Sequence, residues 1–365
     1  MPAANNTPAS LPLPSQHFAV LDGLRGIAAL AVVVYHFMEI VVPDYEHLFI
    51  AHAYLAVDFF FCLSGFVMAC AYDTRLEKIG IGAFLWRRLI RLHPLVLVGS
   101  LLGLLTFRLD PFSDVYAAYA GRAWQVFLAS CLLIPFPVMP ERTFNLFPLN
   151  APTWSLFWEY LANIVYTLVL VRVRPRLLYV LTLLAAAVLI YQATLVPNLS
   201  IGWDRNTFWG GAVRVSYSFL MGLVLYRARW ILSNRLGFVG VGLLLLAGLL
   251  FPYRSNLTGL TDSLTVLVYF PLLVALGAGT HLAPRLAKAC HWLGELSYPL
   301  YMVHYPFVWV FLSYVATQKP PMSTLAWLVP TATLALVGLA YLLLVTVDAP
   351  LRRYLSKRQA LTKAG

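Results

Sequence analysis

The sequence predicts an all-α polytopic membrane protein that crosses a bilayer about ten times. The first observation is composition: 61% of the 365 residues are hydrophobic and only 11% are charged, whereas soluble domains carry about 25% charged residues. The charged residues are too few to cover the surface of a soluble fold. Lipid must therefore surround most of the chain. The second observation is a series of apolar runs of span length. The third is the supply of 20 tyrosines and 10 tryptophans, whose rings suit the two bilayer interfaces.

Ten apolar segments approach the length of about 20 residues that a spanning helix needs. They cover residues 19–41, 53–72, 93–108, 153–171, 177–196, 208–226, 236–251, 263–280, 296–316 and 325–347. A further apolar stretch, 123–138, is shorter and ends in the proline-broken sequence Ile134-Pro135-Phe136-Pro137. Whether the stretch 123–138 crosses the membrane decides the orientation of every later span.

Loop charge indicates that 123–138 does not cross. In that case the basic loops all lie on one side with the basic C-terminal tail, and the opposite side receives acidic residues and few bases. These loops carry Arg75, Lys78, Arg172, Arg174, Arg176, Arg227, Arg229, Arg235, Arg285 and Lys288. This positive-inside pattern predicts that both termini are cytoplasmic and that 123–138 is a re-entrant dip within an outer segment, 109–152. The net charge of +11 then reflects topology and contact with anionic membrane lipids, not nucleic acid.

The predicted domain organisation is simple. Residues 1–17 lack the basic segment and apolar core of a signal peptide, so we expect a disordered N-terminal tail. Residues 18–350 are expected to form one membrane domain, and residues 351–365 a basic cytoplasmic tail. The four cysteines form no CxxC pair, so the sequence signals neither a zinc site nor a disulfide framework, and we expect no metal.

The first span carries two ionisable residues, Arg25 and His36, which are costly in lipid unless they face a cavity or a partner. They are eleven residues apart, which leaves them within about 20° of each other on one helical face, separated by roughly 16 Å along the axis. His36 is either an interfacial histidine or a general base, and its shared face with Arg25 favours the base. Two carboxylates at a similar depth could orient it. Glu159 is favoured over Asp58, which could instead cap a helix or pair with an arginine.

The stretch LWRRLIRLHPL before the third span contains Arg88 and Arg91, which project together at i and i+3, with Arg87 beside them. They are either ordinary cytoplasmic charge or a phosphate site, because guanidinium groups match phosphate oxygens. The entry of Arg25 at the same level favours a phosphate site. An anionic, phosphate-bearing donor inside and a neutral hydroxylated acceptor outside fit this asymmetry.

The ninth span begins GELSYPLYMVHYPF, with Ser297, Tyr301 and His304 at i, i+4 and i+7 on one face. That face must look into the bundle or into water. His304 is either a second proton-transfer group or a hydrogen-bonded core histidine. With Asn150 and Trp154 near the start of the fourth span, these residues are our candidates for acceptor binding.

Six stretches together resemble the acyltransferase-3 family of membrane O-acyltransferases, in the family's order. They are LDGLRGIAALAVVVYHF (21–37), VDFFFCLSGFVMA (57–69), RRLIRLHP (87–94), TWSLFWEYLANIVY (153–166), GELSYPLYMVHYP (294–306) and VDAPLRRY (347–354). The sequence departs from the family where Tyr160 follows Glu159 and where Asp348 stands in place of a glutamate before proline.

The resemblance implies an enzyme of the bacterial inner membrane that uses cytoplasmic acyl-CoA, chiefly acetyl-CoA. The acceptor would be an exported or cell-surface carbohydrate, such as an exopolysaccharide, an O-antigen or a lipid-linked oligosaccharide. His36 would be the catalytic histidine and Arg25 its essential partner. Arg88 and Arg91 would lie near the CoA phosphates, and Glu159 would match the acidic residue after the TWS motif.

Two further questions stay open at the level of sequence. The acyl group could pass directly to the acceptor or through an acyl-histidine intermediate. Two other functions also compete. A metal-dependent lipid-linked glycosyltransferase could use the Asp44-Tyr45-Glu46 triplet, and a proton-coupled transporter could use the buried ionisable residues, although no inverted repeat supports a transporter.

Overall fold

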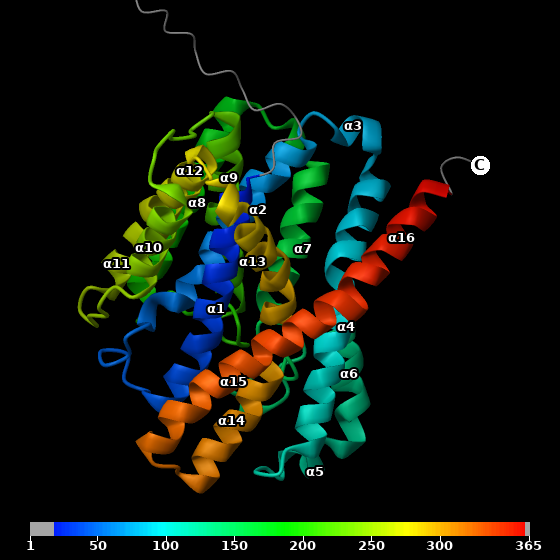
Figure 1. Cartoon of the computed structure of the whole chain (residues 1–365), viewed down its shortest axis with the longest axis vertical. Coiled ribbons are helices and arrows are strands. Elements are labelled where there is room, and N and C mark those ends of the chain that lie inside the picture. Colours follow the sequence, from blue (N-terminus) through cyan, green and yellow to red (C-terminus); the bar gives the residue numbers. More distant parts are fainter. Residues whose placement is uncertain (1–17, 362–365) are drawn as a thin grey trace, which may run out of the picture.

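A computed structural model describes residues 18–361, with side chains up to residue 356, as a bundle of helices (Figure 1). The predicted tail 1–17 and the last residues of the predicted C-terminal tail, 362–365, lie outside the described residues. Within the described part the only β-pairing is two isolated bridges, Asn145 with Asp204 and Asn234 with Thr280. The predicted all-α class is therefore confirmed.

The first half of the bundle contains eight helices. They are α1 (Ala19–Val41), α2 (Ala56–Tyr72), α3 (Leu76–Ile79), α4 (Ile81–Leu109), α5 (Val115–Tyr119), α6 (Ala123–Cys131), α7 (Thr153–Leu168) and α8 (Pro175–Leu195). The second half contains α9 (Phe208–Arg227), α10 (Gly237–Leu249), α11 (Thr258–Leu264), α12 (Phe270–Gly279), α13 (Pro284–Val303), α14 (Tyr305–Gln318), α15 (Met322–Leu343) and α16 (Ala349–Leu361). Single π-helical turns join α11 to α12 and α15 to α16.

Seven helical segments of the described chain are long and apolar enough to cross a membrane, and the bent pair α13–α14 is an eighth. The protein is therefore a multi-pass membrane protein, with fewer clear spans than the ten expected. The difference lies in α7, with 16 residues, and α10, with 13, because both are shorter than the roughly 20 residues that cross a hydrocarbon core. The pair α13–α14 bends by 50° where Pro306 cannot continue the hydrogen-bond ladder.

Small residues set the closest helix contacts. At the crossing of α2 and α9, a side chain at Gly65 would collide with the backbone of Phe219, and one at Gly222 with the backbone of Cys62. Such close approach is how helices pack in lipid, where burial of apolar surface supplies little driving force. The contact fixes α2, and with it Asp58 and Ser64, against α9.

The segment 123–138 does not form a helix of span length. Its helix α6 has nine residues and lies beside the lower part of α4 in Figure 1, where Ser130 shares a 2.8 Å hydrogen bond with Ser100. The adjoining loop is anchored by Arg142, whose guanidinium lies 4.4 Å from the ring centre of Phe107 and 4.8 Å from that of Trp309. Burial lowers the pKa of Arg142 to about 10.

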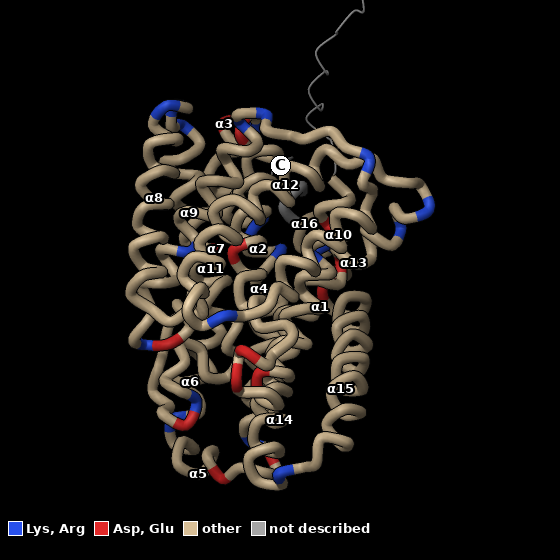
Figure 2. Tube along the Cα trace, turned by 90° about the vertical axis from the view of Figure 1, so that its left-hand side faces the viewer, with Lys and Arg blue, Asp and Glu red and all other residues tan. Residues whose placement is uncertain are grey.

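Basic residues gather at one end of the bundle. Figure 2 shows Lys and Arg segments around α3 and at the adjacent end of α8, with an acidic segment at α3 as well; the end marked by α5 also carries both signs of charge. The loops that contribute this basic end are the ones that the sequence assigned to the cytoplasm.

Candidate functional site

Three cavities adjoin one another along the bundle and share lining residues. The arginine cavity, of about 550 Å³, lies at the basic end among α1, α4, α13 and α16. The middle cavity, of about 130 Å³, shares Arg25 and Arg91 with it. The histidine cavity, of about 270 Å³, shares Val57 and Tyr301 with the middle cavity. The shared residues define a polar path from the basic end towards the opposite end.

The arginine cavity has an excess of positive charge. Two carboxylates, Asp22 and Glu295, line it against five guanidinium groups, which belong to Arg25, Arg87, Arg91, Arg352 and Arg353. Guanidinium groups that converge on one cavity attract a polyanion, and phosphate groups fit their planar donors best.

Arg91 has no counter-ion among the described residues. It lines both the arginine cavity and the middle cavity, is exposed, and makes no hydrogen bond or ion pair with any residue that the structure describes. Arg25, by contrast, donates from Nε to Ser297 Oγ at 2.8 Å and from Nη2 to the Gly294 carbonyl at 2.8 Å. A guanidinium that lines two cavities without a counter-ion among the described residues indicates a site for an anionic ligand.

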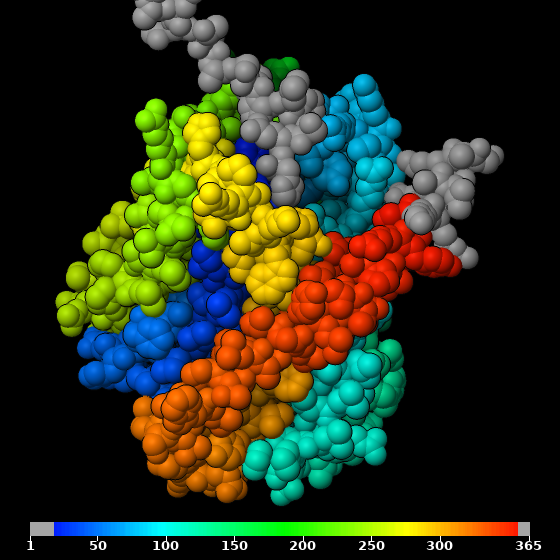
Figure 3. All heavy atoms as spheres, viewed as in Figure 1, coloured from blue at the N-terminus to red at the C-terminus, as the bar shows by residue number. Residues whose placement is uncertain are grey.

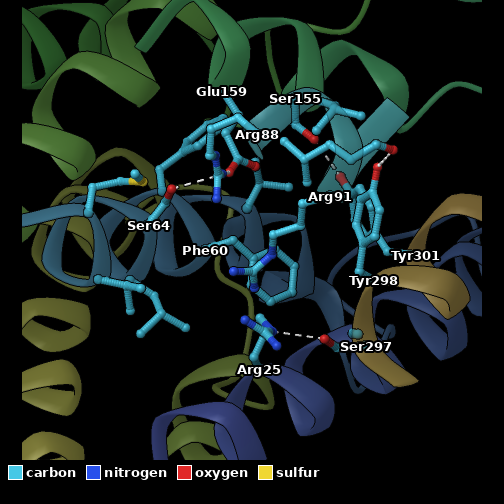
Figure 4. A pocket seen from close by; sticks show the side chains of 18 residues that line it. Arg25, Phe60, Ser64, Arg88, Arg91, Ser155, Glu159, Ser297, Tyr298 and Tyr301 are labelled. Atoms are coloured by element: carbon cyan, nitrogen blue, oxygen red, sulfur yellow. Dashed lines mark hydrogen bonds and ion pairs between the residues drawn. The ribbon is translucent and has the colours of Figure 1, made fainter. Parts of the chain in front are cut away.

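The middle cavity contains an ion pair. Arg88 Nη2 lies 2.5 Å from Glu159 Oε1, and Ser64 Oγ donates to the same oxygen at 3.2 Å (Figure 4). Nearer the histidine cavity, Ser155 Oγ and the Tyr301 hydroxyl share a 2.8 Å hydrogen bond. Glu159, which the sequence favoured as the partner of His36, is thus paired with one of the predicted phosphate-binding arginines. The expected contact is wrong because periodicity gives no information on how α7 is rotated relative to α1.

His36 has a different carboxylate partner. Its Nδ1 lies 2.6 Å from Glu39 Oε1, three residues further along α1. The hydroxyl of Tyr45 donates to the other oxygen of Glu39 at 3.3 Å and lies 2.6 Å from the hydroxyl of Tyr35. Burial, with a smaller contribution from Glu39, raises the pKa of the Tyr45 phenol well above its ordinary value, so Tyr45 stays a donor. Glu39 is not among the residues predicted from the sequence, although its i,i+3 spacing from His36 would have identified it.

His304 stands against His36. The two rings are stacked, with centroids 5.5 Å apart and planes 21° from parallel, and Tyr305 packs edge-on against His36 at 4.8 Å. His304 Nδ1 lies 2.9 Å from the Tyr301 carbonyl, and its buried Nε2 has no hydrogen-bond partner among the described residues. The hydrogen bond of Nδ1 to the Tyr301 carbonyl fits a core histidine, and the unpartnered Nε2 fits a proton acceptor. Both interpretations of His304 retain support.

Asp58 does not face His36. Arg214 donates to it from Nη2 at 2.6 Å, and both side chains are almost fully buried. Arg214 also donates to the carbonyls of Tyr54 and Ile201. Asp58 therefore pairs with an arginine, which is one of the alternatives that the sequence left open. The negative charge of Asp58 neutralises the buried guanidinium of Arg214 at the wall of the histidine cavity.

The candidates for acceptor binding divide into two groups. Trp154 and Tyr301 line the histidine cavity, and Trp154 also lies 5.2 Å from the Arg214 guanidinium. Asn150 is buried and donates to the Met302 carbonyl at 2.8 Å, while Ser297 accepts from Arg25 at the other end of the path. Among the described residues, no group of three or more His, Cys, Asp or Glu is arranged to hold a metal ion.

These features define a class: a multi-pass helical membrane protein with a cationic cavity at one end of an internal polar path and a histidine–carboxylate pair along it. Comparison with known proteins identifies the family. The model of the acyltransferase-3 family, described as an acyltransferase domain, matches residues 18–345. The chain belongs to this family, and the predicted enzyme class, an acyltransferase, is confirmed.

Two relatives show how far the similarity extends. The chain is 36% identical over 167 residues to "Protein 2 in picA locus" of Rhizobium radiobacter, an alignment that covers 42% of this chain and 82% of that protein. It is 25% identical over 368 residues to the "O-acetyltransferase OatA" of Staphylococcus aureus, which covers 91% of this chain but only 57% of the relative. No solved structure matches the chain.

Proposed function

We propose that this protein is an O-acyltransferase of the bacterial inner membrane. It moves an acyl group, with acetyl the first choice, from cytoplasmic acyl-CoA to a hydroxyl of an exported or cell-surface carbohydrate. Membership of the acyltransferase-3 family supports the reaction class, and the name of the S. aureus relative supports O-acetylation. The family match favours this function over a glycosyltransferase or a transporter.

Arg91 is the observation that carries the assignment of the donor. It has no counter-ion among the described residues at the junction of two cavities, and the arginine cavity next to it is large and cationic. CoA combines several phosphates with a long, uncharged arm that ends in a thioester. The phosphates would occupy the arginine cavity while the arm passes Arg91 and Arg25 towards Tyr301. The separation of Arg25 from His36 along α1, roughly 16 Å, is the distance that the arm has to cover.

His36 is the proposed general base, and Glu39 is the carboxylate that holds it. Deprotonation by His36 allows the acceptor hydroxyl oxygen to attack the thioester carbonyl, so that a C–O bond forms and the C–S bond breaks. The proton passes to the imidazole and from there to the departing thiolate of CoA. Glu39 stabilises the imidazolium between the two steps, and Tyr45 fixes the orientation of Glu39.

The arrangement in the membrane is part of the proposal. Ten spans, with α7 and α10 as short crossings and 123–138 as a re-entrant segment, would leave both termini cytoplasmic. The arginine cavity would then open to the compartment that contains acyl-CoA, and the histidine cavity would lie towards the exported acceptor. The concentration of Lys and Arg at one end of the bundle supports this orientation (Figure 2).

The decisive experiment measures release of free CoA from acetyl-CoA by the purified protein in the presence of a carbohydrate acceptor. We expect Arg91→Gln to raise the KM for acetyl-CoA about tenfold or more, because a charge-assisted contact with phosphate is lost. We expect His36→Ala to lower kcat about 100-fold or more with little change in this KM. Absence of release by the wild type with every acceptor would contradict the proposal.

The same assay separates the two routes of transfer. A burst of CoA release without acceptor, of one equivalent per protein and absent from His36→Ala, indicates an acyl-histidine intermediate. Release that depends strictly on acceptor indicates direct transfer.

A further inference from the structure

The C-terminal helix α16 forms one wall of the arginine cavity. Arg352, Arg353 and Ser356 of this helix line the cavity opposite residues of α1, α4 and α13. Figure 3 shows the diagonal strip of atoms formed by α15 and α16 lying across this face of the molecule next to α13. In the sequence these arginines belong to the predicted basic tail and to the stretch VDAPLRRY (347–354), without an assigned role, so their place in the cavity is a finding of the structure.

The cationic groups of the cavity lie at two levels. Arg25 and Arg91 also line the middle cavity, so they form its inner level. Arg87, Arg352 and Arg353 line the arginine cavity alone and form the outer level. Along α4, Arg87 lies one helical turn, or about 6 Å, from Arg91. A ligand that meets both levels must carry negative charge at two separated positions.

Arg352 and Arg353 have different surroundings. Arg352 Nη2 lies 3.1 Å from Glu295 of α13 and 2.8 Å from Asp348, so its charge is neutralised and its contacts fasten α16 to α13. Arg353 is exposed and makes no hydrogen bond or ion pair with the residues that the structure describes. Arg352 is therefore a positioning residue, and Arg353 is the group whose charge is available to a ligand.

We propose that Arg353 binds the 3′-phosphate on the ribose of the CoA donor, with α16 held in place by Arg352. The proposal rests on the proposed function and adds a determinant of donor specificity to it. The two phosphates that link the nucleotide to the pantetheine arm meet the inner level, since the arm must continue past Arg25 and Arg91. The 3′-phosphate lies at the far end of the nucleotide, which corresponds to the outer level.

The test compares two donors, acetyl-CoA and acetyl-3′-dephospho-CoA, with the purified full-length protein. We expect the wild type to prefer acetyl-CoA by about tenfold in kcat/KM, as is typical of one charge-assisted phosphate contact. Arg353→Gln should raise the KM for acetyl-CoA by more than the KM for the dephospho donor, so that this preference is lost. A thermal unfolding temperature in detergent equal to that of the wild type would show that the variant is folded.

Two further variants serve as controls. Arg353→Lys retains the charge and should keep most of the preference. Arg235→Gln removes an exposed arginine of another basic loop that does not line the cavity, and it should leave both donors unaffected.

Three outcomes would overturn the proposal. They are a wild type that uses both donors equally well, an Arg353→Gln variant that loses activity equally with both, and an Arg353→Gln variant that behaves as the wild type. In each case turnover by the wild type leaves the proposed acyltransferase function intact. A wild type inactive with both donors would instead overturn the function and the inference together.

Discussion

His36 and Glu39 lie one turn apart on α1, and this spacing determines which carboxylate holds the imidazole. The sequence identified His36 as a candidate base because a histidine in an apolar helix, on the same face as Arg25, requires an explanation. The i,i+3 spacing makes Glu39 a third candidate partner beside Glu159 and Asp58, and only tertiary packing separates the three. In the structure Glu159 and Asp58 each neutralise an arginine, and Glu39 is left for the histidine.

At the scale of single residues, the test concerns Glu39. Glu39→Gln preserves the size of the side chain and a hydrogen bond to His36 but removes the charge that stabilises the imidazolium. We expect kcat to fall about 100-fold with the KM for acetyl-CoA unchanged, as is typical for loss of acid–base catalysis. Steady-state kinetics of CoA release measure both quantities.

The matched control is Glu46→Gln, which alters an exposed loop carboxylate whose partner is Ser255, and it should have wild-type kinetics. The variant Glu159→Gln could contradict the assignment of Glu39 as the partner of His36. If that variant loses kcat with an unchanged KM while Glu39→Gln remains active, Glu159 is the partner of His36 after all.

At the scale of elements, most helices could be predicted because hydrophobic runs of 20 or more residues have one structural solution in lipid. The segment 19–41 coincides with α1, and 208–226 differs from α9 by one residue. The predicted helix boundaries were wrong where the length of an apolar run does not match the length of the helix. α4 begins at Ile81 because the basic stretch before the apolar run continues the helix, and α13–α14 breaks beside His304 because proline interrupts the ladder. The local sequence does not indicate that α16 forms a cationic wall of the cavity or how α7 is rotated about its axis.

The contact between α2 and α9 depends on the buried pair of Asp58 and Arg214. Asp58→Asn leaves a guanidinium buried without a counter-ion, which costs about 3–5 kcal/mol, so we expect a clear drop in the thermal unfolding temperature in detergent. The double variant Asp58→Asn with Arg214→Gln removes both charges and should recover part of this loss. An Asp58→Asn protein with wild-type thermal stability but no turnover would instead give Asp58 the catalytic role that the sequence allowed.

At the scale of the whole molecule, the distribution of charge agrees with the proposed direction of transfer. The basic loops, the arginine cavity and α16 share one end of the bundle, and the histidine–carboxylate pair lies further along the path. An enzyme that takes an anionic donor from the cytoplasm and serves an exported acceptor needs this polarity. The helices α7, with 16 residues, and α10, with 13, are the short members of the ten proposed spans. The orientation of the site depends on both of them crossing.

Single cysteines in a background without the four native ones test the orientation. If there are ten spans, Arg174→Cys and Arg235→Cys lie in cytoplasmic loops and Asp114→Cys lies in the outer segment; all three positions are exposed. A membrane-impermeant maleimide added to intact cells should label only the cysteine at position 114, and lysis should expose the other two. Failure of α7 to cross would place positions 114 and 174 on the same side. The labelling pattern therefore tests the crossing of α7, and with it the side of the membrane on which the later part of the arginine cavity lies.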